Sequence, residues 1–198
     1  KKVKVFFTCD FDILNFWSEL GRAGFIKRQL KSLTTFQFKK TYNEILSLSK
    51  GNKSLNHNYF LNDNMFFYKK TSKIEIENIA FWLMKKDHPL DCDNDFSSKG
   101  FKTFLKELEN KNITFALHPN YISSSNKVIF KQQIKKFKTV FKFKPLKIRF
   151  HYLNCRFPNA YEQLELLGIK EDFTYSFPDM LAFRGGRSKP GKLWNQSE

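Results

Sequence analysis

The feature that most constrains this chain is a repeated alternation of short apolar stretches with longer amphipathic ones. The short stretches are rich in β-branched and aromatic residues, which is typical of buried strands. They predict strands at residues 3–8, 79–84, 113–117, 146–151, 169–177 and 181–184. The longer stretches predict helices at residues 40–50, 97–111, 128–141 and 158–167. Connections of this length require crossovers, so the first four strands are expected to be parallel neighbours in an α/β fold.

Length and composition are those of a globular chain. The 198 residues can bury one sizeable core, so a single domain over residues 1–198 is expected, and a hydrophobic fraction of 41% excludes a disordered chain. No apolar run approaches the ~18 residues of a membrane span, and no signal-peptide pattern is present. Three cysteines without metal-type spacing favour a reducing cytoplasmic location over a disulfide framework.

The net charge of +16 raises the question of a nucleic-acid partner. The excess is almost all lysine, it is spread along the chain, and it accompanies 24 phenylalanines, which is typical of an AT-rich genome. We therefore expect a diffuse basic surface without specific nucleic-acid binding. A nucleic-acid binder that uses the lysines of residues 131–147 is kept as an alternative.

Polar side chains follow the predicted strands where each one ends. Asp10 and Asp12 lie two apart after the first strand, His118 follows the third, and Arg149 and His151 end the fourth. Two carboxylates on one face of a strand repel unless a cation or a shared proton lies between them, so they predict a metal ligand and a general base. A solvated turn that caps the next helix is the alternative for the two aspartates.

Five segments resemble, in order, the motifs of a bacterial branch of the polysaccharide deacetylases, the NodB-homology superfamily. Residues 8–12 (TCDFD) resemble its T-H-D-V-D, and residues 115–121 (FALHPNY) contain a segment similar to G-L-H-P-S-Y. Residues 149–153 (RFHYL) resemble R-x-H-Y-L, residues 171–174 (EDFT) resemble D-x-T, and residues 182–186 (AFRGG) resemble G-F-R-A-G.

This resemblance implies a distorted (β/α) barrel with a divalent metal, usually zinc, at its carboxyl face. The implied reaction is removal of an acetyl group from an amino-sugar glycan or sugar, with the metal polarising the amide and activating water. By position, Asp10 would be the base and Asp12 a metal ligand, although the two roles could be exchanged. His118 matches the first ligand histidine, and Arg149 matches the arginine that orients the base.

The chain departs from the family's pattern at several positions. Ile122 stands where the superfamily usually has its second ligand histidine, so His151 is the candidate that completes the ligand set. Independently of the family's pattern, the acidic cluster at residues 91–95 is expected to cap the helix predicted at residues 97–111. The family's barrel continues past the last motif, so an incomplete barrel lacking its C-terminal strands is expected. A truncated, non-catalytic deacetylase-like protein that binds a glycan or nothing is therefore a further alternative.

Overall fold

The computed structural model describes residues 3–12, 16–38, 42, 74–156 and 158–175. The predicted helix at residues 40–50 and the predicted strand at residues 181–184 lie essentially outside this range. The chain divides into two compact units. The first unit comprises Lys1–Phe7, Ile13–Asn78 and Asn94–Ile113, and the second comprises Thr8–Asp12, Ile79–Asp93 and Thr114–Glu198.

The strands form one five-stranded parallel sheet in the order β1-β2-β3-β4-β5. The strands are β1 (Val3–Phe11), β2 (Ile74–Leu83), β3 (Thr114–His118), β4 (Lys147–Ile148) and β5 (Glu171–Asp172). Ile79 of β2 pairs with Thr114 of β3, and Leu117 of β3 pairs with Ile148 of β4. The sheet is curled and compatible with part of a (β/α) barrel. The predicted α/β class with parallel strands is confirmed.

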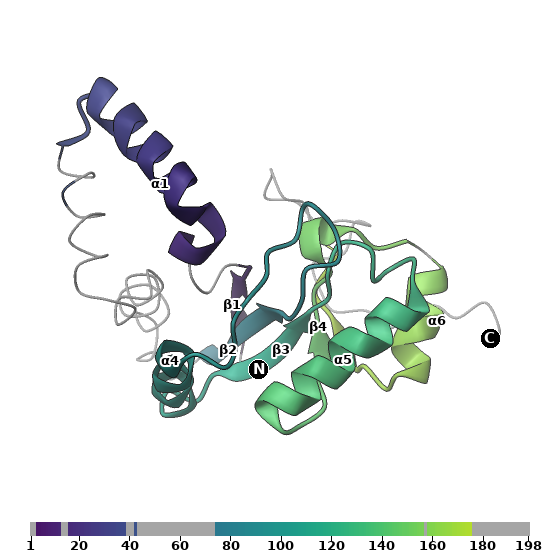
Figure 1. Ribbon diagram of the computed structural model, residues 1–198. Helices are drawn as coiled ribbons and strands as arrows, with labels where there is room; N and C mark the ends of the chain where they lie inside the picture. Colours follow the sequence, from purple (N-terminus) through teal and green to yellow (C-terminus); the bar gives the residue numbers. More distant parts are fainter. Residues whose placement is uncertain (1–2, 13–15, 39–41, 43–73, 157, 176–198) are drawn as a thin grey trace. The chain divides into compact units, whose positions relative to one another are not determined.

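One sheet face of the second unit is covered by the helix α5 (Lys127–Phe141), as Figure 1 shows. Trp82 is fully buried there, and its ring stacks on Phe11 at a centroid distance of 4.4 Å. The ring of Phe141 from α5 lies 5.4 Å from Trp82 and 5.3 Å from Phe115 of β3. Burial of these aromatic side chains is the main force that fixes α5 on the sheet.

The opposite face carries the residues that alternate with this core. The ring of Phe81 lies 5.5 Å from that of Phe173, and the guanidinium carbon of Arg149 lies 4.6 Å above the Phe81 ring. Successive side chains of a strand point to opposite faces, so Phe11 and Trp82 face α5 while Asp10 and Phe81 face the other way. This second face of the sheet is therefore the one that receives the polar side chains.

The N-terminus of α5 is capped by Asn126, whose side-chain oxygen accepts hydrogen bonds from the backbone N–H groups of Val128 and Ile129, both at 3.1 Å. We expect Asn126→Ala to lower the free energy of unfolding by about 1 kcal/mol, because two helix N–H groups lose their acceptor. Asn126→Ser supplies an oxygen at the same place and should restore most of the stability. Urea unfolding of the three proteins checks this; equal stability of all three would contradict it.

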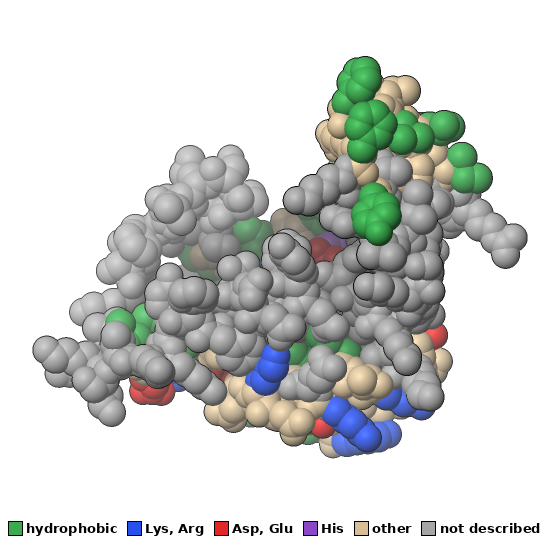
Figure 2. Space-filling model, turned by 90° about the vertical axis from the view of Figure 1, so that its left-hand side faces the viewer, with side chains coloured by type: hydrophobic (Ala, Val, Ile, Leu, Met, Phe, Trp, Pro, Cys, Tyr) green, Lys and Arg blue, Asp and Glu red, His purple; other side chains and the backbone are tan. Residues whose placement is uncertain are grey.

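The first unit contains the helices α1 (Phe16–Thr34) and α4 (Lys99–Glu109). The helix α4 agrees with the predicted helix at residues 97–111, and its N-cap is Ser98, whose side chain accepts from the N–H of Phe101 at 3.2 Å. The sequence did not predict α1. Large apolar side chains are exposed along its second half and just beyond it, and they form the green group at the top of Figure 2. These are Ile26, Leu30, Leu33, Phe36 and Phe38.

The last elements of the second unit are shorter than predicted. After β4 the backbone N–H groups of Arg149 and His151 still reach Leu117 and Pro119 of the β3 end, at 3.2 and 2.9 Å. The chain then forms the short 3-10 helix η2 (His151–Leu153), followed by α6 (Asn159–Leu166). Gly168 follows α6 with a φ of 65°, a conformation that favours glycine. Among the described residues, no helix is long and apolar enough to cross a bilayer.

Candidate metal centre

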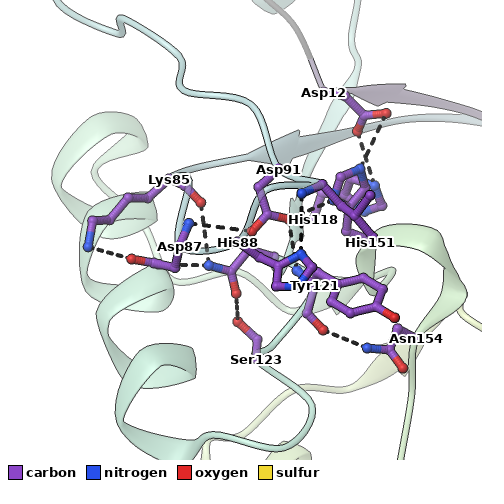
Figure 3. A network of polar contacts seen from close by, with 12 residues as sticks. Asp12, Lys85, Asp87, His88, Asp91, His118, Tyr121, Ser123, His151 and Asn154 are labelled. Carbon is purple, nitrogen blue, oxygen red and sulfur yellow. Dashed lines mark hydrogen bonds and ion pairs between the residues drawn. The ribbon is translucent and has the colours of Figure 1, made fainter.

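Three of the predicted residues meet in the second unit, where β1, β3 and β4 end. Asp12, His118 and His151 each offer one ligand atom, and these atoms lie within 4.8 Å of one another. Nε2 of His118 lies 3.2 Å from Oδ1 of Asp12, and Nε2 of His151 lies 3.8 Å from Oδ2 of the same carboxylate. Figure 3 shows the Asp12 carboxylate above both imidazole rings. The side chains of the two histidines are buried, whereas that of Asp12 is 41% exposed.

The other ring nitrogens determine how the two imidazoles are oriented. Nδ1 of His118 contacts the carbonyl oxygen of Arg149, and Nδ1 of His151 lies 2.8 Å from Oδ1 of Asp91. Both partners can only accept, so each Nδ1 carries a hydrogen. In the neutral ring, the lone pair of each Nε2 then faces Asp12.

Three acceptors that face one another repel unless a positive charge lies among them. Protonating both rings would put two buried cations side by side, with ring centroids 5.1 Å apart. A single divalent cation would satisfy all three acceptors at once. In a tetrahedral site with bonds of about 2.1 Å, ligand atoms are roughly 3.4 Å apart, and here the three candidate ligand atoms lie within 4.8 Å of one another. The group could therefore hold a metal ion.

Asp91 is the residue of this site that the sequence interpretation missed. Its side chain is fully buried, and it accepts hydrogen bonds from His151 and from the backbone N–H groups of Tyr121 at 2.9 Å and Asp87 at 3.4 Å. Burial acts to raise the pKa of the Asp91 carboxyl, but the hydrogen bonds from His151, Tyr121 and Asp87 outweigh it and lower the pKa below its ordinary value. Asp91 therefore holds His151 instead of capping α4, whose cap is Ser98.

Carboxylates that orient a ligand histidine contribute strongly to metal affinity. We expect Asp91→Ala to weaken zinc binding by about 10–100-fold, because His151 would lose the acceptor that fixes its orientation. Asp93→Ala, at an exposed position of the same loop, is the matched control and should leave the affinity unchanged. Zinc titration calorimetry on folded samples measures both, and equal affinities of the two variants would contradict this role of Asp91.

Asp10, near the end of β1, and Arg149, directly after β4, lie together, each two residues before a candidate ligand residue. Nη1 of Arg149 lies 2.9 Å from Oδ1 of Asp10, and Nη2 donates to the Thr8 hydroxyl at 2.9 Å. The nearby acidic residue Glu171 pairs with Lys147, at 2.6 Å. Thr8, Asp10 and Arg149 thus form a fixed charged group beside the metal centre.

A second support for the ligand residues comes from the D-x-T segment. The backbone N–H of Phe150, between Arg149 and His151, donates to the Thr174 hydroxyl at 2.9 Å. Thr174 in turn donates both its hydroxyl and its N–H to Oδ1 of Asp172. Burial raises the pKa of the Asp172 carboxyl above its ordinary value, although the hydrogen bonds from Thr174 and Tyr161 act to lower it. These hydrogen bonds fix the backbone of Phe150, directly before His151.

Cys9 does not join the candidate metal group. Burial, together with the neighbouring charges of Asp10 and Asp12, raises the pKa of its thiol to about 11, and Arg149 offsets this only in part. The thiolate is the form that binds metals, so a thiol with this pKa is a weak ligand at neutral pH.

Comparisons with known proteins identify no relative of this chain: no family model, no curated protein and no solved structure matches it.

Proposed function

We propose that this chain is a metal-dependent hydrolase that removes the acetyl group from an amino sugar, with zinc held by Asp12, His118 and His151. The observation that carries the proposal is the convergence of these three acceptors on one point, with the Asp10–Arg149 ion pair formed by residues that precede Asp12 and His151 by two positions. Three protein ligands leave a fourth position for water or substrate, as in catalytic zinc sites. The order of the motifs, which resemble those of polysaccharide deacetylases, supports the choice of reaction.

Each residue then has a defined task in the reaction. A zinc ion bound there would polarise the amide carbonyl and make a water molecule acidic enough to react at neutral pH. Asp10 takes the proton of the attacking water, while Arg149 and Thr8 hold its carboxylate in place. When the bond between the carbonyl carbon and the nitrogen breaks, the same proton can pass from Asp10 to the leaving amine. The products are acetate and a free amino sugar.

Acetate release tests the proposal. The purified chain, loaded with zinc, is incubated with a trimer of N-acetylglucosamine, and acetate and free amine are both measured. We expect the two products in equal amounts and their loss when a chelator removes the metal. Zinc binding without any product would contradict a hydrolase and support the non-catalytic alternative, a deacetylase-like protein that binds a glycan or nothing.

A further inference from the structure

Tyr152 is an exposed aromatic residue directly beside the candidate metal centre. It follows the ligand candidate His151 in the chain, and 63% of its surface is exposed. The two rings are in contact, with centroids 4.6 Å apart and planes inclined by 51°. A tyrosine at this place presents a flat ring to solvent while it contacts one of the three candidate ligand residues.

The backbone at this residue is strained. Tyr152 has φ 54° and ψ 22°, and Leu153 has φ 53°, so two successive residues with side chains adopt the left-handed conformation. One local and one long-range hydrogen bond hold the turn: the Leu153 N–H donates to the Phe150 carbonyl at 2.9 Å, and the Asn154 side chain donates to the Tyr121 carbonyl at 2.7 Å. Strain of this kind persists at functional sites because the surrounding structure enforces it.

Two further rings are connected to that of Tyr152. The ring of Tyr121 lies 6.1 Å from that of Tyr152, at an angle of 80°. On Tyr121 stacks the ring of His88, at 4.5 Å and 25°. Figure 3 shows Tyr121 and His88 next to the histidines of the metal centre. The rings of Tyr152, Tyr121 and His88 therefore form one connected group beside the candidate metal centre, with Tyr152 as its exposed member next to His151.

We propose that Tyr152 forms a sugar-binding subsite, in which its ring stacks on the apolar face of a pyranose next to the metal centre. This inference rests on the proposed function and specifies the substrate as an amino-sugar oligosaccharide. The C–H bonds on one face of a pyranose are weakly positive, and they suit the negative face of an aromatic ring. A ring that is already fixed by its backbone loses little conformational freedom when a sugar binds.

The test measures sugar binding and stability together, on the full chain kept free of metal. The probe is the trimer of N-acetylglucosamine, titrated by calorimetry. Tyr152→Gly removes the ring and relieves the left-handed strain, so it should weaken binding about tenfold and raise the melting temperature by about 2–4 °C. Tyr152→Phe keeps the ring and should bind like the natural chain.

Lys142→Gly is the matched control. Lys142 is exposed and also has a positive φ, 67°, at the C-terminal end of α5. Its replacement should raise the melting temperature in the same way and leave sugar binding unchanged.

Two results would overturn the subsite: no binding of the trimer to the natural chain, or equal binding by the natural chain and Tyr152→Gly. Acetate release is scored separately. Sugar binding that depends on Tyr152, without acetate release, would support the subsite and contradict the hydrolase. Acetate release with a KM unaffected by Tyr152→Gly would support the hydrolase and contradict the subsite.

Discussion

Replacing His118 with asparagine is expected to lower the zinc affinity of this chain by more than about 100-fold, a larger loss than that of an outer partner such as Asp91. His118 supplies one of only three ligand atoms, and its Nε2 lies 3.2 Å from the Asp12 carboxylate. The asparagine amide can still donate to the Arg149 carbonyl, which His118 Nδ1 contacts in the structure. The substitution therefore removes the ligand while keeping this buried carbonyl paired.

His88→Asn is the matched control for this substitution. His88 lies in the same unit, but its Nδ1 accepts from the backbone N–H of Leu90 at 3.2 Å, and it does not belong to the metal group. Calorimetry gives the affinities, and a rise in melting temperature with zinc shows that the folded state binds it. Equal affinities of His118→Asn and the natural chain would mean that zinc binds elsewhere.

Asp10→Asn is expected to reduce acetate release by about 100- to 10,000-fold, the range attributed to general base catalysis, and to leave zinc binding unchanged. An amide cannot take the proton of the attacking water. Asparagine has nearly the shape of aspartate, and its oxygen can still accept from Arg149 Nη1, 2.9 Å from the Asp10 carboxylate in the structure. The expected result is a folded, zinc-loaded and nearly inactive protein.

Glu171→Gln is the control for the charge change. Glu171 also pairs with a cation, Lys147 Nζ at 2.6 Å, but this pair takes no part in the metal centre. The substitution should leave acetate release within a factor of about two, because exposed ion pairs contribute little. Full activity of Asp10→Asn would remove Asp10 from the mechanism. Loss of zinc in that variant would instead indicate that Asp10 and Asp12 exchange roles.

The fold could largely be predicted because strands and helices alternate clearly in the sequence. The run of Ile79–Leu83 is apolar at every position, and it forms the buried C-terminal half of β2. Parallel strands bring their carboxyl ends to one edge of a sheet, so the amino-acid sequence alone pointed to residues as distant as Asp12, His118 and His151. The structure brings these three together.

The rest could not be predicted for reasons that are specific to each residue. Asp91 lies in an irregular loop among several acidic residues, and its partner His151 is 60 positions away. The helix α1 has a weak apolar periodicity, and several of its apolar side chains are exposed, so no apolar face marks it in the sequence. In β4, pairing ends early because the chain turns into η2, where Tyr152 is left-handed, which no propensity of tyrosine would suggest.

The most direct test of the central claim is the zinc K-edge X-ray absorption spectrum of the purified chain loaded with one equivalent of zinc. The account predicts nitrogen and oxygen ligands only, at about 2.0–2.2 Å, with the outer-shell scattering of two imidazole rings from His118 and His151. In His118→Asn the signal of one ring should disappear. A sulfur ligand near 2.3 Å, or zinc surrounded by oxygen without imidazole, would contradict a centre built from Asp12, His118 and His151.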